Sequence, residues 1–208
     1  MVRRSKTSGR GLKEDPTDPF AQRVKSENWR SRAVFKLEEI DRREKLLKAG
    51  AVCLDLGSAP GAWSQYAQRK LGKAGTVIAV DVLKMEHLEG VRFVQGDIRE
   101  EAVFASLLAL LPERQVDVVL SDLAPNMSGV DAIDQPRAMH LSERALDLAA
   151  RVLKPGGSAL IKVFQGSGFQ ELVGASRGWF GRVRLTQPRV SPSRSPEMYL
   201  LAKDFRMV

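Results

Sequence analysis

A lysine inside an apolar run is the residue with the clearest potential for chemistry in this sequence. Lys162 lies in the segment S-A-L-I-K-V-F, where an unpartnered ammonium group would be costly to bury. Asp122 ends the preceding predicted strand and Glu197 opens the last one. If the last strand runs antiparallel beside that of Lys162, both carboxylates lie at the edge of the sheet where this lysine ends. The alternative is an edge strand from which the ammonium group reaches solvent.

A lysine held by acids in this way can take up a proton or stabilise a developing negative charge. A second lysine, Lys36, lies one heptad from Trp29, at the border of the apolar face of a helix predicted from Ser26 to Leu47. Taken alone, Lys36 is typical of a surface lysine whose stem packs on the apolar face.

Four predicted strands end in or near an aspartate: Asp55, Asp81, Asp97 and Asp122. Open parallel sheets bind ligands at the carboxyl ends of their strands. One aspartate alone is more often a turn or capping residue, but four at the same edge indicate a site. The turn G-S-A-P-G at 57–61 lets a ligand approach the backbone, because glycine has no Cβ.

The same turn indicates which ligand the site would take. It is not G-x-G-x-x-G, and its proline lacks an N–H that a pyrophosphate would use. Asp81 suits a ribose diol, and Asp97 suits an adenine amino group. A nucleoside cofactor without phosphates fits best, which indicates S-adenosylmethionine. The alternative, a nicotinamide dehydrogenase on a similar sheet, is disfavoured by the turn.

These residues are positioned by a predicted alternation of strands and helices. Such an alternation indicates an α/β fold with a parallel sheet covered on both faces. The last two strands leave no room for a helix between them and are expected to form a hairpin with the final strand antiparallel. Strands are predicted at 51–56, 75–82, 91–97, 116–122, 158–164, 182–187 and 197–205, and helices at 26–47, 62–71, 100–111, 136–153 and 168–177, with K-P-G-G at 154–157 as a helix stop and turn.

The composition of the 208 residues limits the class of protein. The net charge is +8, and it divides into +6 over residues 1–48, −3 over 49–176 and +5 over 177–208. Two basic ends are typical of a polyanion-binding protein, although solvated surfaces look the same. The single cysteine fits a reducing cytosol. No metal site, membrane span or secretory signal is expected.

Taken together, the motifs resemble those of the FtsJ/RrmJ family of ribosomal RNA 2′-O-methyltransferases. The resemblance covers nearly the whole chain after residue 20. It is carried by S-R-A-V-F-K-L-E-E-I-D, L-D-L-G-S-A-P-G-A-W-S-Q, A-V-D, G-D, S-D-L-A-P-N-M-S-G, L-K-P-G-G-S-A-L-I-K-V-F-Q-G and S-P-S-R-S-P-E-M-Y-L-L-A-K-D-F. It implies a Rossmann-like class I methyltransferase with a mostly parallel seven-stranded sheet and an antiparallel last strand.

The resemblance also implies the site residues. The family's Lys–Asp–Lys–Glu tetrad falls on Lys36, Asp122, Lys162 and Glu197, with Lys162 as proton acceptor. The implied cofactor is S-adenosylmethionine, and the family's cofactor-binding residues fall on Gly61, Trp63, Asp81, Asp97 and Asp122. A base role requires Lys162 to be neutral; a protonated Lys162 would orient the hydroxyl oxygen and stabilise its charge.

The implied substrate is a ribose 2′-hydroxyl, that of a uridine in the A-loop of 23S rRNA in the large ribosomal subunit. Alternatives are a tRNA anticodon-loop or mRNA-cap hydroxyl, and a non-catalytic RNA-binding assembly factor that keeps the fold. Residues 1–20 are expected to be a flexible basic arm and 21–208 a single methyltransferase domain, acting as a cytoplasmic monomer.

Overall fold

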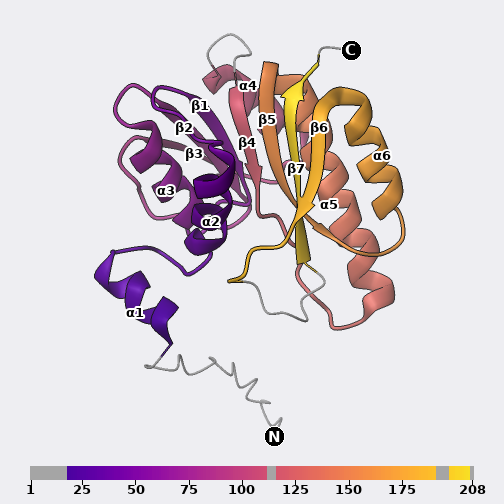
Figure 1. The fold of residues 1–208 in the computed structure, drawn as a ribbon, viewed down its shortest axis with the longest axis horizontal. Helices are drawn as coiled ribbons and strands as arrows, with labels where there is room; N and C mark the ends of the chain where they lie inside the picture. Colours follow the sequence, from indigo (N-terminus) through magenta and orange to yellow (C-terminus); the bar gives the residue numbers. More distant parts are fainter. Residues whose placement is uncertain (1–17, 112–115, 191–196, 207–208) are drawn as a thin grey trace, which may run out of the picture.

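A seven-stranded mixed sheet forms the centre of the computed structural model (Figure 1), which describes residues 18–111, 116–190 and 197–206. The strand order is β3-β2-β1-β4-β5-β7-β6, and β7 alone runs antiparallel to its neighbours. The predicted fold class, with its antiparallel last strand, is confirmed. The strands are β1 (Val52–Leu56), β2 (Thr76–Asp81), β3 (Val91–Gln95), β4 (Val116–Ser121), β5 (Leu153–Phe164), β6 (Phe180–Thr186) and β7 (Glu197–Phe205).

Helices cover both faces of this sheet, because buried side chains alternate between the two faces along each strand. Cys53 packs with helices α2 and α3 on one face, whereas Leu54 and Leu56 pack with α4, α5 and α6 on the other. Figure 1 shows α2 and α3 apart from α5 and α6. The helices are α1 (Pro19–Ser26), α2 (Val34–Glu44), α3 (Ala62–Leu71), α4 (Glu101–Leu110), α5 (Asp131–Val152) and α6 (Phe169–Trp179).

The strand order reverses between β1 and β4. β1 starts one half of the parallel sheet and β4 starts the other. β1 pairs in parallel with β2 on one side and with β4 on the other. The connections after these two strands therefore leave in opposite directions, which opens a crevice at their carboxyl ends. The glycine-rich turn after β1 and Asp122 after β4 both lie at this edge.

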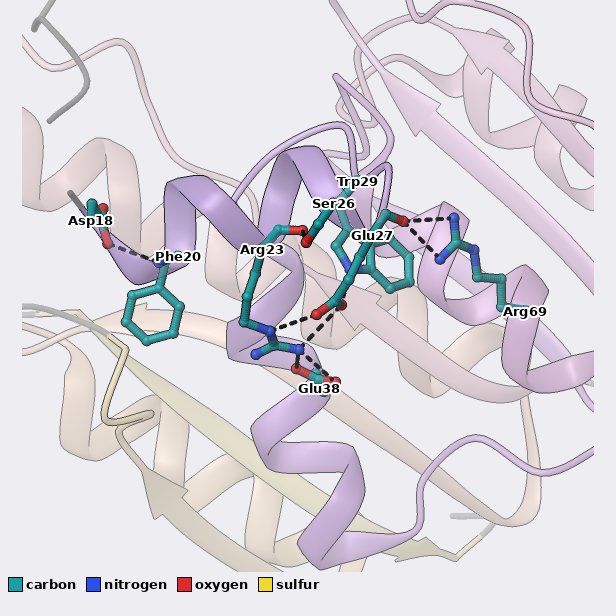
Figure 2. Close-up of polar contacts among 8 residues, drawn as sticks. All are labelled: Asp18, Phe20, Arg23, Ser26, Glu27, Trp29, Glu38 and Arg69. Carbon is teal, nitrogen blue, oxygen red and sulfur yellow. Dashed lines mark hydrogen bonds and ion pairs between the residues drawn. The ribbon is translucent and has the colours of Figure 1, made fainter. Parts of the chain in front are cut away.

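The helix predicted over 26–47 is wrong at its start. Ser26 does not cap it but ends α1, and α2 begins only at Val34. Figure 2 shows the reason: Arg69 of α3 donates to the Glu27 carbonyl, while the Trp29 indole donates to the Glu27 carboxylate at 2.7 Å. The Arg69 guanidinium also stacks on the Trp29 ring, 3.9 Å from its centre. These contacts hold residues 27–33 out of a helix.

Arg23 attaches α1 to α2, since its guanidinium binds Glu27 at 2.6 Å and Glu38 at 3.1 Å (Figure 2). The basic arm expected over residues 1–20 lies outside the described residues except for its last three. Of these, Asp18 caps α1 by accepting from the backbone N–H of Phe20.

Two further boundaries, the starts of α5 and β5, differ most from the prediction. α5 begins at Asp131, five residues earlier than expected, and contains Pro136. The buried Asp134 carboxylate accepts three hydrogen bonds from Ser128 and Gly129, which fix the approach to the helix. The segment K-P-G-G lies within β5, where the pairing with β4 shifts register, rather than in a separate turn.

Candidate active site

A cluster of charged side chains forms where β4 ends and β7 begins. Lys162 and Tyr199 are register partners on β5 and β7, as are Phe164 and Glu197. Because β7 is antiparallel, Glu197 at its start lies beside the carboxyl end of β5. The Lys162 ammonium lies 2.9 Å from Asp122 Oδ1 and 3.6 Å from Glu197 Oε2, and its side chain is only 8% exposed. The lysine is thus buried between two carboxylates.

Lys36 of α2 completes the cluster from above the sheet. Its ammonium lies 2.6 Å from Glu197 Oε1, and its side chain is 19% exposed. The structure therefore brings together all four predicted tetrad residues, from three strand ends and one helix. Two cations and two anions balance in charge, which reduces the cost of burying each of them.

Alternation along the strands explains why these side chains share one face. Leu120 and Leu160 pack in the core beneath α2 and α3, and the side chains two residues further along point the same way. Asp122 and Lys162 are those residues. Tyr199 lies in the same core, and Glu197, two residues before it, follows the same rule.

Tyr199 belongs to the site, although the sequence did not single it out. Its hydroxyl donates to Asp122 Oδ1 at 2.7 Å and approaches Glu197 Oε1 at 3.3 Å. Burial, together with the charges of Asp122 and Glu197, raises the pKa of Tyr199 well above its usual value, so it stays a hydrogen-bond donor. Its position opposite Lys162 is the signal that could have revealed it, once the hairpin register was known.

Glu197 remains ionised despite its partial burial. Burial on its own raises a carboxyl pKa, but the hydrogen bond from Lys36 and the charges of Lys162 and Lys36 outweigh it and lower the pKa of Glu197. The carboxylate therefore serves as a permanent acceptor that fixes both ammonium groups.

A cavity of about 810 Å³ adjoins this cluster at the carboxyl ends of the strands. It is lined by the three predicted acids Asp81, Asp97 and Asp122, and by Gly57 and Ala59 of the glycine-rich turn. Asp81 follows the expected geometry for a diol acceptor: it ends β2, and its two oxygens accept from the backbone N–H groups of Ala59 and Leu83. Each oxygen retains a lone pair for a further donor.

The walls of the cavity fit an adenosyl group. Val82 and Leu83 are 58% and 65% exposed at its edge, which is unusual for large apolar side chains and suits a flat aromatic base. Asp97 is oriented by the Arg99 guanidinium, which forms a hydrogen-bonded pair that outweighs burial and lowers the pKa of Asp97. Gly57 has φ +75°, and a Cβ there would lie 3.0 Å from the Leu123 backbone nitrogen. The turn thus requires glycine.

Gly61 and Trp63 do not line this cavity. Gly61 precedes α3, with φ +108°, and a Cβ there would collide with the Arg30 guanidinium. The Trp63 indole donates to the Ala33 carbonyl at 2.8 Å, and its ring packs 5.7 Å from that of Tyr199. Trp63 thereby fixes the start of α2 by a hydrogen bond and packs against the ring of Tyr199.

Arg30 also escaped the sequence reasoning. Its guanidinium donates to the carbonyls of Pro60, Glu86 and His87. It therefore joins the segment before α2 to the glycine-rich turn and to the loop after β2. Every residue has a main-chain carbonyl, so the three acceptors of Arg30 cannot be recognised from the sequence. Only the fold shows that Arg30 joins these segments.

Asp55 is not part of the cavity, although it was grouped with the other strand-end aspartates. It lies inside β1 with no exposed surface, and Ser64 of α3 donates to its Oδ2 at 2.6 Å. Its Oδ1 has no hydrogen-bond partner. Burial, which outweighs the Ser64 hydrogen bond, and the nearby charges of Asp122 and Asp81 raise the pKa of Asp55 to about 7.

The described residues 18–111, 116–190 and 197–206 contain no group of three or more histidine, cysteine or acidic side chains arranged to hold a metal ion. Over the same ranges, none of the helices combines the length and the apolar character that crossing a membrane demands.

Comparison with known proteins finds one family over most of the chain. The family model for FtsJ-like methyltransferases matches residues 29–205. Proteins named ribosomal RNA large subunit methyltransferase E are similar: that of Legionella pneumophila (strain Paris) is 49% identical over 99% of this chain and 100% of its own. That of Pseudomonas aeruginosa (strain PAO1) is 51% identical over 98% of both.

Solved structures agree with the fold. A Plasmodium falciparum protein described as a candidate ribosomal RNA methyltransferase is 29% identical, with a TM-score of 0.77 over 85% of this chain and 98% of its own. An S-adenosylmethionine-dependent methyltransferase from Aquifex aeolicus, 19% identical, has a TM-score of 0.54 over 88% and 97% and shares the fold alone.

The raised pKa of Asp55 predicts how stability depends on pH. Between its ordinary value of 3.8 and about 7, the folded chain keeps a proton that the unfolded chain has lost, so stability falls as pH rises. Asp55→Asn removes this titration while keeping the acceptor for Ser64. Relative to the wild type, the variant should gain about 3 kcal/mol between pH 5 and pH 8, measured by urea unfolding. Parallel stability profiles would contradict this prediction.

Proposed function

The chain belongs to the FtsJ-like methyltransferase family, and we propose that it transfers a methyl group from S-adenosylmethionine to a ribose 2′-hydroxyl of 23S rRNA. The proposed target is a uridine in the A-loop of the large ribosomal subunit, in the cytoplasm, with the chain acting as a monomer. The observation that carries the proposal is the position of Lys162, held between Asp122 and Glu197 beside an adenosyl-sized cavity. The names of the relatives support the substrate class.

We propose that the cavity holds the cofactor through the three acids that line it. Asp81 accepts from the ribose hydroxyls, Asp97 from the adenine amino group, and Asp122 lies at the end nearer Lys162. Gly61 lies against Arg30 and Trp63 packs on Tyr199, and neither lines the cavity. Their roles in cofactor binding stay predictions from the family pattern. When bound, S-adenosylmethionine supplies a methyl group made electrophilic by its sulfonium.

Lys162 is the proposed proton acceptor. In its neutral form, Lys162 Nζ would accept the proton of the 2′-hydroxyl as that oxygen takes the methyl group, and the cofactor sulfur would keep the electron pair of the bond it loses. In the ammonium form that the two carboxylates favour, Lys162 would instead orient the hydroxyl oxygen and stabilise its developing charge. In-line displacement depends on alignment of the reacting atoms, so a fixed amine matters as much as a basic one. Three oxygens fix it: the Asp122 carboxylate at 2.9 Å, the Asp122 carbonyl at 3.3 Å and the Glu197 carboxylate at 3.6 Å.

The remaining residues position this amine. Glu197 bridges Lys162 and Lys36, and its lowered pKa keeps it charged. Tyr199 donates to Asp122 Oδ1, the same oxygen that Lys162 contacts, and so helps to fix the carboxylate. RNA is favoured over DNA because only RNA carries the 2′-hydroxyl that the reaction consumes.

Lys162→Ala should remove methyl transfer and keep cofactor binding. We expect the single-turnover rate on rRNA to fall by about 100-fold or more, because the group that contacts the hydroxyl is lost. S-adenosylmethionine affinity, measured by calorimetry, should change little. Lys154→Ala is a matched control: it removes a lysine from the other end of β5 that pairs with an aspartate of β4, at 2.5 Å.

Wild-type turnover in the Lys162 variant would refute its role, and no transfer by the wild type would refute the function. Mapping 2′-O-methyl marks on 23S rRNA, in cells with and without the gene, identifies the nucleotide.

Tyr199→Phe should lower the rate while the fold remains. The substitution keeps the ring that packs on Trp63 but removes the hydroxyl that donates to Asp122 at 2.7 Å. Asp122 then loses one of the groups that fix its carboxylate, so we expect turnover to fall by about 10-fold with an unchanged affinity for RNA. Circular dichroism and filter binding provide the controls. An unchanged rate would show that Lys162 alone sets the geometry.

A further inference from the structure

A basic surface lies at the β6 edge of the sheet, apart from the cluster around Lys162. A shallow cavity of about 510 Å³ opens there, and its charged lining consists of five cations and the single carboxylate of Glu44. We call the surface formed by these five cations the β6 surface. Its members are Arg177, Arg182, Arg184, Lys203 and Arg206. Arg177, Arg182, Arg184 and Arg206 are exposed, and Lys203 is half-buried.

Strand alternation gathers three of these side chains, those of Arg182, Arg184 and Lys203, on one face. Arg182 and Arg184 are two residues apart on β6, and their register partners on β7 are Lys203 and Leu201. Leu201, Tyr199 and Glu197 follow at steps of two along β7 and face the same way as Lys203. These three cations are therefore on the face of the sheet that also carries the catalytic cluster, whereas Arg177 reaches the same cavity from α6 and Arg206 from the end of β7. Lys203 lies six positions after Glu197 along β7, a distance of about 20 Å.

Internal pairing neutralises only part of this charge. Glu44 of α2 forms ion pairs with Arg184 and, at 3.9 Å, with Lys203. The guanidinium groups of Arg177, Arg182 and Arg206, by contrast, make no hydrogen bond or ion pair within the residues that the structure describes. Three arginines with all their donors available, on one shallow surface, are suited to phosphate groups, which arginine binds through two parallel hydrogen bonds.

We propose that the β6 surface binds the sugar-phosphate backbone of the RNA substrate, about 20 Å from the methylated ribose. This inference rests on the proposed function, because it takes rRNA as the substrate. Charge complementarity favours RNA as the occupant. A protein partner would require an apolar centre, but the two large apolar residues of the lining, Phe180 and Leu201, are buried in the core. Contacts of this kind orient a substrate without reading its sequence.

Loss of the three unpaired arginines should weaken RNA binding in a salt-dependent way. For Arg177→Gln/Arg182→Gln/Arg206→Gln, the plot of log K for rRNA against log salt should become shallower. Its negative slope should lose about 2 to 3 in magnitude, since each lost phosphate contact removes close to one counterion. The matched control, Lys73→Gln/Arg92→Gln/Arg151→Gln, removes the same charge from exposed positions elsewhere and should keep the wild-type slope.

Failure of the β6-surface proposal and failure of the proposed function give different results in the same assay. At saturating RNA the triple variant should keep the wild-type single-turnover rate, because the Lys162 cluster is intact. Equal slopes for triple variant and control, with normal wild-type activity, would overturn the β6 surface alone. An increased tendency to self-associate with unchanged RNA binding would mean that the arginines only guard the sheet edge, and would also overturn the proposal.

A crosslinker placed on the surface locates its partner directly. The single cysteine of the chain, Cys53, is fully buried, so Arg182→Cys introduces an exposed thiol for a photoactivatable probe. With large ribosomal subunits as substrate, crosslinks should form to rRNA and exceed those from Arg92→Cys on β3, the opposite edge strand. Crosslinks to ribosomal protein alone, or no excess over the Arg92 control, would overturn the proposal.

Discussion

The burial of the Lys162 ammonium between two carboxylates is the interaction on which the rest of this structure depends. The ammonium group of a lysine whose side chain is only 8% exposed must be compensated by opposite charge and hydrogen bonds, since an unpaired buried charge is strongly destabilising. Its partners come from β4 and β7, far apart in the sequence. The cluster thus exists only when the β4–β5–β7 part of the sheet has its observed order and register.

The antiparallel direction of β7 satisfies this requirement. In a sheet whose other six strands begin at one edge, a parallel last strand would place its first residue at the edge away from the site. Because β7 runs in reverse, Glu197 pairs with Phe164 at the end of β5. A register slip of one residue would turn Tyr199 and Glu197 to the opposite face, so the hairpin with β6 and the site constrain each other.

Much of this arrangement could be predicted from the sequence. The period of the apolar residues gave the seven strands, and the acids at their ends indicated the cavity and the partners of Lys162. Tyr199 was missed because a tyrosine in the run E-M-Y-L-L-A is typical of a core residue until the register is known. The break at 27–33 was missed because Arg69, which prevents the helix, lies some 40 residues further along. Asp55 was misplaced because position in a strand does not reveal burial.

Asp122 joins the two halves of the site. Its backbone N–H donates to the Leu56 carbonyl at the end of β1, so the residue is fixed at the point where the strand order reverses. It lines the cavity, while its Oδ1 accepts from both Lys162 and Tyr199. A group in the cavity and a hydroxyl at Lys162 would therefore be positioned by one residue. Strand pairing across β1, β4 and β5, rather than a mobile loop, then sets the distance between methyl donor and acceptor.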